Sequence, residues 1–204
     1  MKKQLLLSFL IATGYTVTAQ TTAIPDPLFE QELINLSIDS DGIVNGQIAT
    51  ADAEAITSLT INPENTGSDY IADLTGIEAF VNLENLTVNF TIIEELNVST
   101  MPNLKHLNCI DNTLEYLDVS NNPLLEELYL HTGGDVYPLN SINQIDLSHN
   151  PNIRKLTASA ISYINLKNGN NNPDMIIYIG VPDLPTELPN TCIINRFKGS
   201  TSWY

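Results

Sequence analysis

An α/β solenoid is the fold class that the sequence predicts, with short parallel strands stacked side by side, mostly irregular half-coils that return the chain, and an N-terminal helical cap. Two observations predict the stack. An apolar six-residue phrase recurs along most of the 204 residues at intervals in the twenties, which is the signature of a repeating solenoid. A second phrase, rich in turn-forming residues, falls between its copies. A helix-start signal close to residue 26 predicts the cap.

The first phrase has the form [Leu/Ile]-x-x-[Leu/Ile]-x-apolar. Its copies open at Ile56, Leu83, Leu104, Leu125, Ile153 and Ile176. Within a copy the fourth and sixth residues point to one side and the fifth points to the other, as in a strand. We therefore expect Leu107 and Cys109 inside and Asn108 outside. One coil cannot bury its apolar edge alone, so the coils have to share a continuous core.

The second phrase opens at Ile93, Leu114, Ile142 and Ile161. It continues into NVSTMP, DVSNNP, DLSHNP and the looser NLKNGN, whose Asp, Asn, Ser and Pro residues suit tight turns. At the ninth residue of a repeat, counted from the start of the first phrase, Asn112 stands between two repeats in which Thr91 and Gly133 replace an asparagine. Two repeats carry extra residues, at 62–70 and 131–139. Insertions in solenoids form loops on one side, so both should project from the same edge.

Residues 1–19 have the features of a secretory signal peptide. Lys2 and Lys3 precede an apolar run over residues 5–12, and Val17-Thr18-Ala19 forms a small-residue cleavage site. The sequence therefore predicts a secreted protein that is extracellular, periplasmic or at the cell surface, and no membrane span in the mature chain. Removal of two lysines changes the formal charge from −16 to −18 (−16 − 2).

Residues 20–55 are predicted to form the N-terminal cap. Asp26 is a good N-cap residue and Pro27 a good first helical residue. The segment DSDGIVNGQ (39–47) loosely resembles a calcium loop, but Val44 and Thr50 occupy the positions where that loop needs a glycine and an acidic residue. Two turns, at residues 41–42 and 45–46, explain this segment better.

Residues 56–181 hold the repeats and residues 182–204 the C-terminal cap, where Phe197 and Trp203 are expected to cover the last coil. Cys109 and Cys192 lie too many coils apart for a disulfide bond, and Cys109 is expected to act as a small buried apolar residue. The sequence contains no C-x-x-C, H-E-x-x-H, G-x-S-x-G or P-loop pattern. It therefore predicts no cofactor, no metal site and no enzyme.

The stretch LKHLNCIDNTLEYLDVSNNPL (104–124) resembles a leucine-rich repeat. Together with IPDPLFEQELINL, DSDGIVNGQ and DLTGIEAFVNLENL, it makes nearly all of the mature chain similar to secreted bacterial leucine-rich-repeat proteins of the internalin-like kind. The resemblance implies that the strands line a concave face and that this face binds a ligand. It implies nothing about which ligand.

The second, third, fifth, seventh and eighth residues, counted from the start of the first phrase, are expected to point outward, and residues at the same position in successive repeats form a column. Charged residues in these columns alternate in sign between neighbouring repeats. The second column holds Glu84, Lys105, Glu126 and Arg154, and the third holds Asn85, His106, Glu127 and Lys155. Opposite charges on adjacent strands form favourable lateral pairs of roughly 0.2–1 kcal/mol, so these columns are explained by structure alone. The acidic balance argues against nucleic acid or an anionic membrane as a partner, because both need a basic surface.

Apolar and aromatic residues farther along the strands are not explained by these pairs. The candidate binding residues are Phe90, Ile110, Asp111, Tyr129, His131 and Tyr178. Exposed aromatic residues beside polar groups are typical of binding surfaces. The alternative is that the 131–139 insertion folds back and covers them.

The sequence therefore favours a secreted, non-enzymatic binding module that recognises a protein or glycan through its concave face. A structural or assembly component of the cell surface, without a discrete ligand, is the alternative. A polysaccharide hydrolase is a third possibility and would require an open carboxylate pair, such as Glu127 with Asp111.

Overall fold

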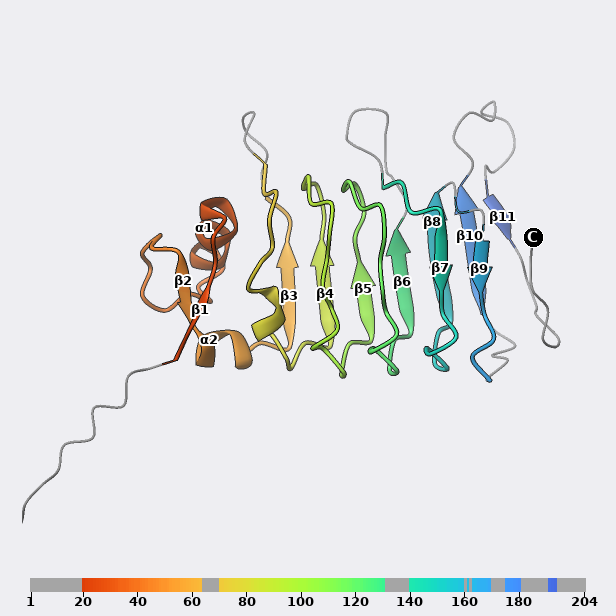
Figure 1. Ribbon diagram of the computed structural model, residues 1–204, viewed down its shortest axis with the longest axis horizontal. Coiled ribbons are helices and arrows are strands. Elements are labelled where there is room, and N and C mark those ends of the chain that lie inside the picture. Colours follow the sequence, from red (N-terminus) through yellow and green to blue (C-terminus); the bar gives the residue numbers. More distant parts are fainter. Residues whose placement is uncertain are drawn as a thin grey trace, which may run out of the picture.

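A computed structural model describes residues 20–63, 70–130, 140–159, 161, 163–169, 175–180 and 191–193. The chain begins with β1 (Thr21–Ala23), α1 (Pro27–Asn35), β2 (Gln47–Ala49) and α2 (Thr50–Glu54). A row of strands follows: β3 (Ser58–Ile61), β4 (Asn85–Val88), β5 (His106–Asn108), β6 (Glu127–Leu130), β8 (Lys155–Ser159), β10 (Ile176–Gly180) and β11 (Thr191–Ile193). Figure 1 shows these strands standing side by side.

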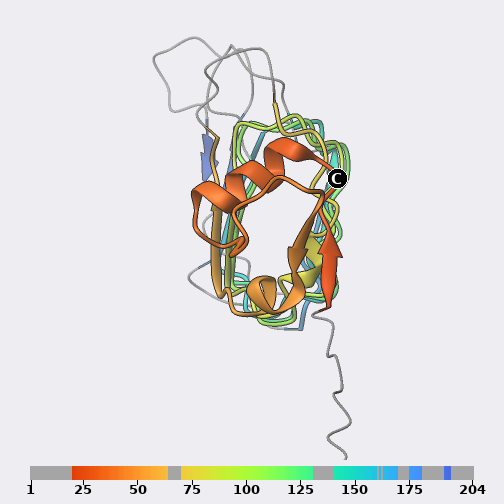
Figure 2. The ribbon, with the colours of Figure 1, turned by 90° about the vertical axis from the view of Figure 1, so that its left-hand side faces the viewer.

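The strand row is one seven-stranded sheet in the order β11-β10-β8-β6-β5-β4-β3. All neighbours are parallel except β10 and β11, which pair antiparallel. On the other side of the coils, β7 (Gln144–Asp146) and β9 (Tyr163–Asn165) form a two-stranded parallel sheet, and a short 3₁₀ helix, η1 (Ile77–Ala79), lies in the first coil. The end-on view of Figure 2 shows the coils superposed as one closed outline.

The register of the sheet follows the first phrase. The fourth residues of the phrase align across neighbouring strands: Leu59, Leu86, Leu107, Leu128, Leu156 and Ile177. Leu107 and Cys109 are completely buried, and Asn108 between them is partly exposed. The predicted inward and outward alternation is thus confirmed, and the phrase that contains Cys109 forms the continuous sheet.

The predicted start of the sixth copy is wrong. Ile177 pairs with Leu156, so the phrase opens at Asp174 and not at Ile176. The apolar run from Met175 to Ile179 satisfies the pattern in two phases, and the true first position holds an aspartate that the pattern rejects. With the corrected start, the repeat spans residues 153–173, which is the same length as the central repeats.

Asparagine side chains close the corners that follow β5 and β6. The Asn112 amide donates to the Val88 carbonyl at 2.7 Å and accepts from Thr91 N–H at 3.1 Å. One coil later, Asn140 donates to the Cys109 carbonyl at 2.6 Å and accepts from Leu114 N–H at 3.0 Å. The prediction that Gly133 replaces the repeat asparagine is therefore wrong, because the insertion at 131–139 only delays that asparagine to position 140.

A second asparagine ladder runs along the returning half-coils. Asn122 donates to the carbonyls of Val98 and Met101, both at 2.9 Å. Asn150 donates in the same way to Val119 and Asn122, at 2.8 and 2.9 Å. Both asparagines are completely buried. The coils of Asn122 and Asn150 are therefore bonded to the preceding coil through the turn as well as through the strand.

The turns themselves repeat one local motif. In the turns of the second phrase, and in one earlier turn, a side-chain oxygen accepts the backbone N–H two residues farther on: Asp73, Asn97, Asp118, Asp146 and Asn165. Asp and Asn favour this arrangement because their short side chains mimic a backbone turn. The phrase identified four times in the sequence thus has a fifth structural copy at Asp73.

The N-terminal segment packs at the β3 end of the stack (Figures 1 and 2). Asp26 accepts from Leu28 and Phe29 N–H at 2.8 and 3.3 Å, as predicted for an N-cap residue. Phe29 and Leu33 are buried in the same core as the coils. In the following loop, Gly42 and Gly46 have φ of 67° and 85°, so the two predicted turns are present. Within the described residues, no helix is long and apolar enough to cross a membrane.

Three groups of predictions lie outside the described residues. They are the signal peptide at 1–19, most of the insertion at 62–70 with all of that at 131–139, and the packing of Phe197 and Trp203.

The asparagine ladder predicts a position-specific loss of stability. Replacing Asn122 with Ala leaves two buried carbonyls without their donor, so we expect the free energy of unfolding to fall by about 2 kcal/mol. The neighbouring Asn121 is exposed, and Asn121→Ala is the matched control, expected to change stability by less than about 0.5 kcal/mol. Urea unfolding followed by circular dichroism measures both. Equal effects of the two substitutions would contradict the ladder's role.

Candidate functional site

The outer face of the seven-stranded sheet carries the predicted charge columns. Lys105 pairs with Glu84 at 2.8 Å, and Arg154 pairs with Glu126 at 3.1 Å. Strand register places these residues on neighbouring coils, so each pair links two repeats. The sequence prediction of lateral ion pairs is confirmed. These pairs are largely exposed, and each therefore contributes little to stability.

Glu127 is the most connected charge on this face. It contacts Arg154 at 2.6 Å and His106 at 3.4 Å, and it accepts the Tyr129 hydroxyl at 2.7 Å. Partial burial acts to raise the pKa of its carboxyl, but the Tyr129 hydrogen bond and the charges of Arg154 and His106 together outweigh it, so the pKa is lowered. The carboxylate thus remains ionised and joins three coils.

Tyr129 is held from two directions. Its hydroxyl donates to Glu127, and the Lys155 ammonium lies 4.9 Å from the centre of its ring, within the range of a cation–π contact. Burial and the hydrogen bond to Glu127 raise the pKa of its phenol. The ring is therefore positioned before any ligand arrives, and it stands partly exposed on the sheet face.

Phe90 and Asp111 occupy the same place in successive repeats, just after β4 and β5. Both have a left-handed backbone, with φ of 57° and 54°. Phe90 remains partly exposed, whereas Asp111 is only 3% exposed. Ile110 beside it is partly exposed, and its N–H donates to Asn89 Oδ1 at 3.1 Å. The prediction of Asp111 as a surface residue is therefore wrong, because its side chain is buried. The left-handed backbone alone is not the reason, since Phe90 shares it and stays partly exposed.

The structure describes the backbone of Tyr178 but not its side chain, and it does not describe His131. Tyr178 pairs with Thr157 and so extends the fifth column that contains Tyr129, while its side chain lies outside the described part. His131 and the 131–139 insertion are also outside it. The structure thus places Phe90, Ile110 and Tyr129, each partly exposed, on three adjacent coils. Whether they form one site with His131 and Tyr178 stays a prediction.

Burial raises the pKa of the Cys109 thiol, which keeps this thiol protonated within the core. Among the residues that the structure describes, no group of three or more His, Cys, Asp or Glu side chains is arranged to hold a metal ion. The carboxylate pair suggested for hydrolysis is not available, because Asp111 is buried and Glu127 is engaged by three partners.

Parallel strands in one register, with asparagine-bearing corners between them, define a leucine-rich-repeat solenoid. No family model and no curated protein matches the sequence. Solved structures similar to the chain include the functional domain of InlJ from Listeria monocytogenes, with 24% identity, 83% of this chain and 41% of that chain covered, and a TM-score of 0.49.

Two further similar structures come from the same organism. An internalin, InlF, has 20% identity, 83% and 56% coverage of the two chains and a TM-score of 0.46. Internalin C2 has 18% identity, 79% and 98% coverage and a TM-score of 0.33. This chain spans less than two thirds of the length of InlJ and InlF. The predicted leucine-rich-repeat fold is established by the strand ladder of this chain itself.

The Glu127 network predicts a defined pH dependence. Because its pKa is lowered in the folded state, the stabilisation from Glu127 is fully present above its ordinary value of 4.5 and is lost as the pH falls through the lowered value. We expect Glu127→Gln to reduce the free energy of unfolding at pH 7 by about 1 kcal/mol and by much less at pH 3.

Urea unfolding of both proteins at the two pH values measures this difference. Glu54→Gln, at an exposed glutamate that ends α2, is the control and should leave the unfolding free energy nearly unchanged at both. A Glu127→Gln effect that is the same at pH 3 and pH 7 would contradict the assigned role of the carboxylate.

Proposed function

We propose that this protein is a secreted, non-enzymatic binding module that recognises a protein or a glycan through the outer face of its seven-stranded sheet. Phe90, Ile110 and Tyr129 form the centre of the contact surface. His131, Tyr178 and the 131–139 insertion belong to the same proposed site. Asp111 is not a contact residue, because its side chain is buried.

The position of Tyr129 carries the proposal. Its hydroxyl and its ring are fixed by Glu127 and Lys155, so little side-chain entropy is lost when a ligand packs against it. The neighbouring acidic side chains are already paired with Lys105 and Arg154. A face that is rigid, partly aromatic and locally balanced in charge suits a polar but uncharged surface, such as a glycan or the polar surface of a protein.

Removing the aromatic side chains of Phe90 and Tyr129 should weaken ligand binding. Residues 20–204 are immobilised and tested against cell-envelope extracts and a glycan array, beside a Phe90→Ala/Tyr129→Ala double variant. We expect a ligand captured by the wild type to bind the variant at least tenfold more weakly, since two aromatic anchors of roughly 1–2 kcal/mol each are removed.

Tyr116→Ala is the matched control, because Tyr116 lies on a half-coil that returns the chain and not on the seven-stranded sheet. It should leave this ligand's binding unchanged. Thermal unfolding of each variant verifies the fold. Equal capture by the wild type and the double variant would place the site elsewhere, and recovery of only the protein itself would favour the structural role.

A further inference from the structure

The returning side of the coils has an outer surface with different chemistry from the sheet face. We use the term return face for the exposed side chains of residues 94–97, residues 115–118, β7 and β9. Between its first two coils lies an open hollow of about 450 Å³. Its lining includes Glu94, Glu95, Glu115, Tyr116 and Asp118.

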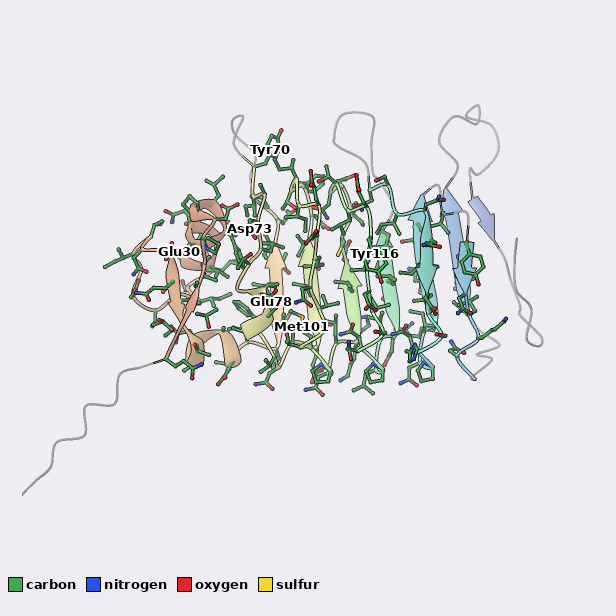
Figure 3. The ribbon with its side chains drawn as sticks, viewed as in Figure 1. Glu30, Tyr70, Asp73, Glu78, Met101 and Tyr116 are labelled. Atoms are coloured by element: carbon green, nitrogen blue, oxygen red, sulfur yellow. The ribbon has the colours of Figure 1, made fainter. Side chains whose placement is uncertain are left out.

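Tyrosines of the return face lie in one column. Tyr116 is 63% exposed, the highest value among the large hydrophobic residues exposed in the described part of the chain, and Tyr163 is 40% exposed. Gln144 pairs with Tyr163 in register, and it occupies the same position of the second phrase as Tyr116. The two tyrosines are therefore two coils apart, which is roughly 10 Å at the usual spacing of strands. Figure 3 shows Tyr116 in the middle of the stack.

The charges of the two faces differ. Every ion pair found among the described residues involves Glu84, Glu126 or Glu127, on the strands of the large sheet or directly before them. On the return face, Glu94, Glu95 and Glu115 are exposed and have no hydrogen bond or ion pair within the described residues. Lys105 and Arg154 pair with carboxylates of the sheet face, whereas the described lysine of the return side, Lys167, follows β9 and not the coils that line the hollow. The lining of the hollow is therefore negative.

We propose that the return face binds an extended, lysine- or arginine-rich segment of another protein, with a basic side chain in the hollow beside Tyr116. The long apolar stem of such a residue packs on an aromatic ring while its charged end reaches the carboxylates. Charge complementarity selects this occupant over a neutral glycan or an acidic protein. This surface is independent of the proposed ligand site, because it lies on the opposite side of the coils.

The spacing of the tyrosines adds a geometric requirement. A peptide in the extended polyproline II conformation has three residues per turn and advances about 3.1 Å per residue, so side chains three residues apart point to the same side and are about 9 Å apart. Basic residues at positions i and i+3 of the bound segment therefore reach Tyr116 and Tyr163 together. A peptide of four Lys-Ser-Ser repeats has this spacing, and four Glu-Ser-Ser repeats provide its charge-reversed counterpart.

The test measures binding of the fluorescein-labelled Lys-Ser-Ser peptide to residues 20–204 by fluorescence anisotropy at about 0.1 M salt, where long-range attraction between exposed charges is largely screened. We expect the lysine peptide to bind and the glutamate peptide not to bind. Tyr116→Ala should weaken binding about threefold. Glu94→Gln/Glu115→Gln should weaken it roughly fivefold or more.

A second double variant separates local binding from general attraction to an acidic protein. Glu32→Gln/Glu54→Gln removes the same net charge from α1 and α2 and should change the affinity less than about twofold, because these sites are distant from the hollow. Tyr129→Ala should also leave peptide binding unchanged. The proposal for this site can therefore be wrong while the proposal for the sheet face is right, and the reverse also holds. Equal weakening by the two double variants, or no binding of the lysine peptide, would overturn the proposal.

Discussion

Each coil of this protein is stable only because the next coil lies against it in the same register. The fourth-position residues from Leu59 to Ile177 form one buried row, and a coil shifted by one residue would turn its apolar side chains to the solvent. Additional residues are therefore tolerated only where the chain leaves the sheet. The insertion at 131–139 comes directly after β6, and the corner closes again at Asn140 with the same hydrogen bond to the preceding coil that Asn112 makes.

The two asparagine ladders make this register specific. Apolar contact alone is tolerant of small shifts, whereas a buried carbonyl without a donor costs about 1–3 kcal/mol. Asn122 and Asn150 each satisfy two carbonyls of the preceding coil. Met101 stands at the corresponding position of an earlier coil, where it provides a carbonyl acceptor but no amide. The ladder on the return side therefore begins at Asn122, and the coils before it depend more strongly on apolar packing.

The sequence predicted the strand register, the ion pairs and the N-cap at Asp26, because each follows from a pattern with one physical solution. It predicted the sixth strand wrongly, since the apolar run around Ile177 allows two phases and only pairing with Leu156 selects between them. Asp111 was misplaced for a different reason. The periodic pattern assumes an extended backbone, but the chain is left-handed there, with φ of 54°. Aspartate adopts this conformation more often than most residues, but the residue type does not say whether the side chain is then buried, since Phe90, with φ of 57°, stays partly exposed.

The candidate binding surfaces were only partly predictable for a related reason. Outward columns are visible in the sequence, but whether their charges are satisfied depends on which coils are neighbours. On the sheet face, alternation of sign between adjacent coils pairs the carboxylates with Lys105 and Arg154. On the return face, the column of Glu94 and Glu115 has no such alternation. Because the sequence holds 24 acidic and 8 basic residues, pairing the carboxylates of the sheet face leaves those around the hollow unpaired, and the two sides of the solenoid differ in the charge that they present.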